Sequence, residues 1–195
     1  MNRVPSSAYS EGNTARPRSR LHARFALAAL SVIGLAALAW TSFVQPLPRL
    51  VYNPSDSVFV GWYRIEPFHR RPHSLPVGSI ILTRLPGDAA VLAAQRGYLP
   101  THIPLLKRVG AVAPQHVCIV QGQVRIDGVP VAAVLSADRL GRALPFWQPC
   151  RPLVEGELFL LSVSNPASFD SRYFGPVSAA AVIGIARPIW PEARP

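Results

Sequence analysis

A run of twenty residues without a charge, from Phe25 to Val44, constrains the fold of this chain more than any other feature. As an α-helix this run is about 30 Å long, which is the thickness of the hydrocarbon core of a bilayer. Basic residues mark the cytoplasmic end of a membrane helix, and the run is preceded by Arg16, Arg18, Arg20 and Arg24. We therefore expect a single-pass anchor, with the N-terminus inside and the rest of the chain outside.

A cleaved secretory signal is the alternative, because residues 37–39 (Ala-Leu-Ala) have the small side chains of a cleavage site. The region before the apolar run is long, however, and the run continues past Trp40, so we favour an uncleaved anchor. Both interpretations export the bulk of the chain. The expected parts are a disordered basic tail, the anchor and an exported domain, over residues 1–24, 25–44 and 45–195.

The composition of the exported part favours a small β domain. The 21 prolines and 13 glycines of the chain argue against a long helical bundle and predict short strands joined by turns. The net charge of +10 suggests nucleic acid as a partner. The arginines, however, either precede the apolar run or are scattered without interleaved aromatic residues, which suits a membrane surface better. We expect no nucleic-acid partner.

The exported part is expected to be mainly β, as a small antiparallel domain. Strands are expected over residues 57–65, 79–84, 105–113, 117–120, 123–126, 129–134, 158–163 and 179–186. Asp127-Gly128 is a strong hairpin signal between two of these strands. A single helix is expected over residues 88–96, with Asp88 as its N-cap and Gly97 at its end.

The two cysteines, Cys118 and Cys150, lie in the exported part of the chain, where the compartment is oxidising. They most simply form one disulfide, which closes a loop of about 30 residues and stabilises the fold by roughly 3–4 kcal/mol. Two free buried thiols are the alternative. The histidines show no metal-ligand spacing, so we expect no metal and no cofactor.

Lys107 is the only lysine among the 20 lysines and arginines of the chain. Arginine stays protonated, whereas a buried lysine can lose its proton and act as a base. Alternation along a strand places Leu105, Lys107 and Val109 on one apolar face and Arg108 on the other. Lys107 is therefore a candidate for a lowered pKa and a catalytic role. The alternative is a lysine whose amine extends to water.

Two further segments complete a recognisable order of motifs: NPSDSVFVGWY at residues 53–63 and NPASFDSRYFGP at residues 165–176. With the anchor and the lysine strand, this order resembles the type I signal peptidase family of serine–lysine proteases. The similarity is greatest to the short conjugative-transfer branch, the TraF-type pilin-processing peptidases. Chains of that branch end near Arg-Pro-x-Trp, which is Arg187-Pro188-Ile189-Trp190 here. The resemblance covers about residues 25–190.

The resemblance implies that Ser57 is the nucleophile and Lys107 its general base. It also implies that the Ser55 hydroxyl binds the oxyanion and that Ser168 forms a hydrogen bond with the lysine amine. Asp170 and Arg172 would form an ion pair that braces this segment. The chemistry is coherent, because a lysine deprotonates a serine only where desolvation lowers its pKa, and Leu105 and Val109 would supply the dry wall. The alternatives are that the serines are ordinary turn residues and that Asp170 and Arg172 are a surface pair.

The chain also departs from the family pattern. Phe59 replaces the usual proline after the nucleophile and is expected to change the pocket wall. Val60 replaces a polar or basic residue, and residues 114–116 (Pro-Gln-His) replace Pro-Gly-Asp. None of these changes removes a reacting group.

The sequence thus predicts a membrane-anchored serine endopeptidase at the periplasmic face of the bacterial inner membrane. The resemblance implies that it processes, and allows that it cyclises, the pilin precursor of a conjugative type IV secretion system. The expected partners are a prepilin or preprotein substrate, membrane lipid and mating-pair proteins. A general signal peptidase that removes leader peptides and a catalytically inactive β scaffold of the secretion apparatus are the alternatives.

Overall fold

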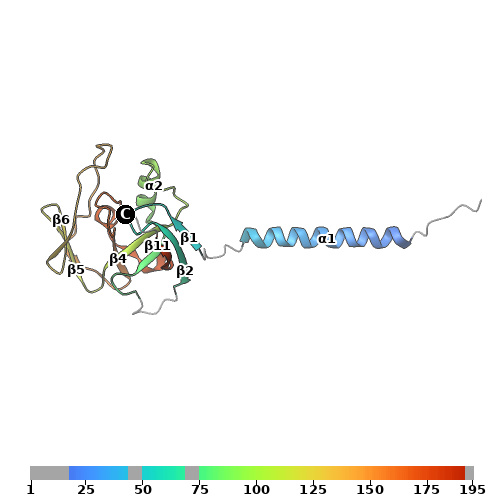
Figure 1. Ribbon diagram of the computed structural model, residues 1–195. Helices are drawn as coiled ribbons and strands as arrows, with labels where there is room; N and C mark the ends of the chain where they lie inside the picture. The colour runs from blue at the N-terminus through green and yellow to red at the C-terminus, as the bar shows by residue number, and fades with distance from the viewer. Residues whose placement is uncertain (1–17, 44–49, 69–74, 192–195) are drawn as a thin grey trace, which may run out of the picture. The chain divides into compact units, whose positions relative to one another are not determined.

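The computed structural model describes residues 18–43, 50–68 and 75–191, which form two units (Figure 1). The first unit contains the helix α1, Arg18–Phe43. Its segment from Arg20 to Trp40 is long and apolar enough to cross a membrane, and its side chains are exposed. The helix begins before the uncharged run because residues 18–24 include arginine, leucine and alanine, which favour helices. These residues were expected to be disordered. The rest of the expected tail and Val44 lie outside the described residues.

The second unit is mainly β, and all of its strand pairs are antiparallel, as expected. A seven-stranded sheet has the order β1-β2-β11-β3-β4-β9-β10, with the bounds Leu50–Asn53, Gly61–Pro67, Val182–Pro191, Ile80–Thr83, Leu105–Val112, Glu157–Leu161 and Val177–Ser178. A four-stranded sheet has the order β7-β6-β5-β8, with the bounds Val129–Ala133, Gln123–Ile126, His116–Val120 and Arg151–Pro152. Figure 1 shows β5 and β6 on the side of the unit away from β1 and β2.

The strand expected over residues 57–65 begins only at Gly61. The preceding residues form a turn because the Asn53 amide donates hydrogen bonds to the carbonyls of Ser55, Val58 and Phe59, at 2.7, 3.1 and 3.0 Å. These bonds draw the backbone back on itself, so it cannot join the ladder of the sheet. The short strand β1, before this turn, was not expected.

The helices also differ in detail from the expectation. The helix α2 covers Gly87–Gln95, and its N-cap is Pro86; Asp88 lies within the first turn. Gly97 follows the helix with a φ of +70°, as expected for a glycine at a helix end. The short helix α3, Ser171–Phe174, was not expected, because its N-cap Asp170 lies within a segment otherwise interpreted as a motif. Residues 179–181 form a 3₁₀ turn, η1, before β11.

The lysine strand β4 lies inside the larger sheet, between β3 and β9. Its residue Val109 is fully buried, together with Leu160 on β9 and Ile81, which is the register partner of Lys107 on β3. The Lys107 side chain therefore extends from a strand whose neighbouring strands contribute buried residues to the core.

Cys118 on β5 and Cys150, which precedes β8, are joined as a disulfide. The two strands are neighbours in the smaller sheet, with His116 opposite Pro152. This arrangement is compatible with the bond expected from the sequence.

Candidate active site

Ser57 lies in the turn between β1 and β2, and its side chain is buried. The carbonyl of Ser57 accepts hydrogen bonds from Ser162 Oγ at 2.9 Å and from the Val163 amide at 2.8 Å. The next residue, Val58, is fully buried in an apolar cluster. The backbone that carries the Ser57 hydroxyl is therefore fixed on both sides.

The Ser57 hydroxyl belongs to a short chain of hydrogen bonds. Ser57 Oγ lies 3.0 Å from Ser55 Oγ, and Ser55 Oγ donates to Asn53 Oδ1 at 2.9 Å. A hydroxyl has one hydrogen to donate, so the hydrogen between the two serines belongs to Ser57. Rotation of the Ser55 hydroxyl away from Asn53 frees its hydrogen for another acceptor.

The Lys107 side chain is only 2% exposed. Its Nζ donates a hydrogen bond to Ser168 Oγ, which is also buried. Burial lowers the pKa of the Lys107 amine from 10.5 to about 8; Asp170 opposes this shift, Arg172 adds to it, and Asp56 opposes it. The alternative in which this amine extends to water is therefore wrong.

The ion pair of Asp170 and Arg172 is buried, so the interpretation as a surface pair is also wrong. Both side chains are at most 2% exposed, and Arg172 Nε donates to Asp170 Oδ1 at 2.8 Å. Arg172 Nη2 donates to Asp170 Oδ2 and to the Ser168 carbonyl, both at 2.9 Å. The pair thus holds the backbone of the residue that contacts the lysine amine.

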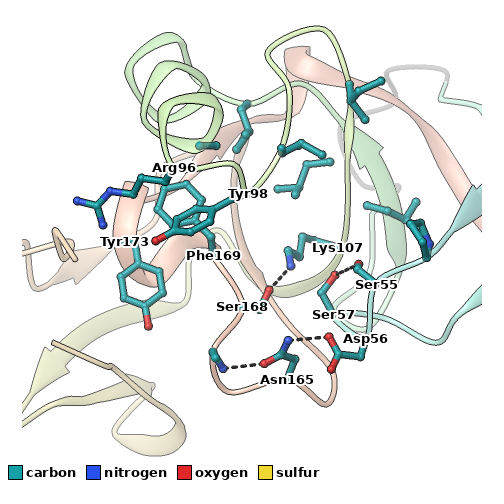
Figure 2. Close-up of a pocket in the computed structure, with 18 of the residues that line it drawn as sticks. Ser55, Asp56, Ser57, Arg96, Tyr98, Lys107, Asn165, Ser168, Phe169 and Tyr173 are labelled. Atoms are coloured by element: carbon teal, nitrogen blue, oxygen red, sulfur yellow. Dashed lines mark hydrogen bonds between the residues drawn. The ribbon is translucent and has the colours of Figure 1, made fainter. Parts of the chain in front are cut away.

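A cavity of about 570 Å³ brings these groups together. Its lining includes Ser55, Ser57, Lys107 and Ser168, together with the half-buried Leu105 of the expected dry wall. Figure 2 shows the Lys107 amine directed toward Ser168 and the Ser57 hydroxyl directed toward Ser55. Phe59 was expected to change the pocket wall, but it is exposed and is not a lining residue.

Sequence reasoning missed a contact between the two loops of the site. Asn165 Nδ2 donates to Asp56 Oδ1 at 2.6 Å, and Ser164 Oγ donates to the Asp56 carbonyl, also at 2.6 Å (Figure 2 draws the first bond). Both partners lie within the quoted motifs, but no spacing relates positions 109 residues apart. The contact joins the turn that carries Ser57 to the loop that carries Ser168.

His116 lies beside the disulfide. The spacing of His116 from the two cysteines in the sequence did not indicate this contact. Its Nδ1 is 3.4 Å from Cys118 Sγ, and the ligand atoms of His116, Cys118 and Cys150 lie within 4.8 Å of one another. With both sulfurs in a disulfide, the group offers no thiolate to a metal ion.

The chain matches a known family along most of its length. A family model described as signal peptidase, peptidase S26, matches residues 22–190. A conjugal transfer protein TraF from Agrobacterium fabrum is 37% identical over 152 residues, which are 73% of this chain and 81% of that protein. A probable conjugal transfer protein TraF from Sinorhizobium fredii is 32% identical over 167 residues, which are 82% and 84% of the two chains. A solved signal peptidase I from Enterococcus faecalis is 22% identical, with a TM-score of 0.37, and the match covers 60% of this chain and 97% of that one.

Proposed function

The chain belongs to the signal peptidase family, peptidase S26, and from this membership we propose that it is a membrane-anchored endopeptidase of the serine–lysine type. The single observation that carries the proposal is the buried Lys107 amine, which lines the same cavity as the Ser57 hydroxyl. Only the neutral amine can accept a proton. With a pKa of about 8, roughly one tenth of the Lys107 amine is neutral at pH 7, far more than for a lysine at its usual pKa of 10.5.

In the proposed reaction, the Ser57 hydroxyl turns from Ser55 toward the neutral Lys107 amine, which takes its proton as the serine oxygen attacks the scissile carbonyl. The Ser57 amide and the Ser55 hydroxyl donate to the oxyanion, and one such donor contributes roughly 3–4 kcal/mol to the stability of the transition state. The Lys107 ammonium then protonates the leaving amine as the peptide bond breaks, which leaves an acyl-enzyme on Ser57. Ser168 orients the amine throughout.

We place the reaction at the periplasmic face of the inner membrane, with α1 as the anchor and the N-terminus in the cytoplasm. The apolar segment of α1 and the arginines before it support this orientation. The disulfide of Cys118 and Cys150 suits the oxidising periplasm. The substrate is proposed to be the pilin precursor of a conjugative secretion system, supported by the relatives named as conjugal transfer proteins.

The acyl-enzyme is resolved either by water or by the N-terminal amine of the same pilin. Water gives a linear trimmed product, and the amine gives a cyclic product that is lighter by one water. Mass spectrometry of the processed pilin distinguishes the two products.

The decisive experiment compares prepilin processing in cells that carry wild-type protein, Ser57→Ala or Lys107→Ala. We expect both variants to accumulate uncut precursor and to form no pilus. Ser178→Ala is the matched control, because Ser178 is exposed and lies outside the cavity lining. Normal pilus assembly with Ser57→Ala would instead identify a scaffold, and accumulation of many uncut preproteins would identify a general signal peptidase.

A further inference from the structure

The cavity extends beyond Ser57 and Lys107 to the end of α2 and to residues 138–144. Its lining there includes one carboxylate and three guanidinium groups, which we call the arginine end: Arg96, Asp138, Arg139 and Arg142. Figure 2 shows Arg96 on one side of Lys107 and Ser57 on the other. The reaction proposed above uses none of the arginine end.

Asp138 offsets only one of the three positive charges of this end, and its oxygens already have hydrogen-bond partners. Oδ1 accepts from the amides of Leu140 and Arg142, at 2.9 and 3.0 Å. Oδ2 accepts from the Tyr98 hydroxyl and from Arg142 Nε, the latter at 2.7 Å. Desolvation acts to raise the pKa of Asp138, but these hydrogen bonds outweigh it and hold the pKa well below its usual range. The carboxylate is therefore fully engaged with its own loop.

Arg139 and Arg96 keep unused donors. Arg139 is exposed and forms no hydrogen bond or ion pair with any residue that the structure describes. Arg96 Nη2 donates to the Ala143 carbonyl at 2.8 Å, but Arg96 Nη1 has no hydrogen-bond partner among the described residues. The nearest carboxylate oxygen to Nη1 belongs to Asp138, at 3.9 Å. Positive charge thus exceeds negative charge at the arginine end.

The lining of the cavity also includes apolar side chains, among them Leu85, Leu99 and Leu105. Coulombic attraction is stronger beside such walls than in open water. Guanidinium groups present a planar fork of donors that matches a carboxylate. A peptide bound at Ser57 enters the same cavity whose lining includes Arg139.

We propose that the arginine end binds a carboxylate of the peptide substrate, and that Arg139 makes this contact. The carboxylate comes from an Asp or Glu side chain near the scissile bond or from the C-terminus of a short segment after it. This inference rests on the proposed function, because it assumes that peptides enter the cavity. It makes Arg139 a residue that determines specificity, with no role in the chemical step.

The test uses full-length protein in detergent and synthetic peptides with small residues before the scissile bond. In one set, Glu or Gln occupies successive positions on both sides of that bond; in another, the C-terminus is a free carboxylate or an amide. We expect a Glu at one of these positions, or the free C-terminal carboxylate, to give a kcat/KM roughly tenfold higher than the matching Gln or amide peptide. In Arg139→Gln this ratio is expected to fall to about one. The matched control is Arg125→Gln, because Arg125 lies on β6, which contributes no residue to the cavity lining.

Binding to Ser57→Ala, measured by fluorescence anisotropy, separates this inference from the proposed reaction. We expect Ser57→Ala to bind the carboxylate peptide more tightly than the neutral peptide, and this difference to disappear when Arg139→Gln is added. That result supports carboxylate binding at the arginine end even if the wild type cuts neither peptide and the proposed function fails. Equal kcat/KM for both peptides overturns the inference while leaving the peptidase intact. If Arg139→Gln keeps the preference for the carboxylate peptide, the inference is also overturned. If this variant in addition binds vesicles of anionic lipid less well than the wild type, Arg139 is a lipid contact instead.

Discussion

The buried amine of Lys107 determines how activity depends on pH. Burial holds its pKa at about 8, so the protonated form predominates below that pH and the neutral base above it. We predict that kcat/KM rises about tenfold per pH unit below about pH 8 and levels off above it. Initial rates on one peptide across this range measure the profile. A rate that stays constant from about pH 6 to pH 9 would exclude Lys107 as the base.

The same burial has a consequence for stability. Below about pH 8 the amine is charged in both folded and unfolded protein, and the folded state carries the full cost of burying that charge. Between pH 8 and 10.5 only the unfolded state binds the proton, so stability from this group increases as pH rises.

We predict that Lys107→Met, which removes the charge and shortens the side chain by one heavy atom, raises the free energy of unfolding by about 2 kcal/mol near pH 6. This value allows for the lost hydrogen bond to Ser168. The gain is expected to shrink as the pH approaches 10. Urea unfolding at several pH values measures it, and Arg84→Met serves as the control, because Arg84 is exposed. A variant less stable than wild type at every pH contradicts the prediction.

Two loops supply most of the site, and the bond between Asn165 and Asp56 joins them. We predict that Asn165→Asp lowers kcat by at least tenfold, because it places two carboxylates in contact and shifts the turn that carries Ser57. The double variant Asp56→Asn with Asn165→Asp reverses donor and acceptor, and we expect it to recover most of the lost rate.

The comparison forms a double-mutant cycle on kcat, with thermal unfolding as a check on folding. Additive losses in the double variant would show that the two side chains act separately. Ser164→Ala removes the neighbouring bond to the Asp56 carbonyl without adding charge, so it should cost less.

Arg172 connects the parts of the whole domain. Besides Asp170 and Ser168, its Nη1 donates to the carbonyls of Pro166 and of Ala133, at 2.8 and 2.7 Å. Ala133 ends β7 in the smaller sheet, so one side chain links that sheet to the loop of the lysine partner.

We predict that Arg172→Lys lowers the free energy of unfolding by about 3–5 kcal/mol, because an ammonium cannot replace these donors and leaves buried partners unsatisfied. The control is Arg151→Lys. Its partner Glu157 lies in a more exposed pair, so we expect a much smaller loss of stability. Chemical denaturation measures both, and equal losses would mean that Arg172 has no special structural role.

The local pattern of residues in the sequence was sufficient to predict the features that depend on a single strand or turn. The alternation around Lys107 predicted its burial beside Val109, and Asp127-Gly128 predicted the hairpin between β6 and β7. The serine and lysine segments were linked by resemblance alone, because alternation carries no information about which strands are neighbours.

Features that depend on side chains meeting across the fold were not predictable. The Asn53 amide turned an expected strand start into the turn around Ser57, and nothing in the spacing of residues indicates that it bonds to three carbonyls. The arginine end was also missed, because Arg96 and Asp138 come together only when residues 138–144 pack against the end of α2.

Because Lys107 is the only lysine, a protease that cuts only after lysine has one target bond in the whole chain, and that bond lies inside β4. Cleavage there requires the central sheet to open. The rate of digestion by such a protease therefore reports global unfolding and does not depend on the motion of surface loops. Amine-directed covalent reagents likewise meet a single side-chain amine besides the N-terminus, that of Lys107 in the cavity lining. The protein thus carries its own site-selective reporter without any engineered label.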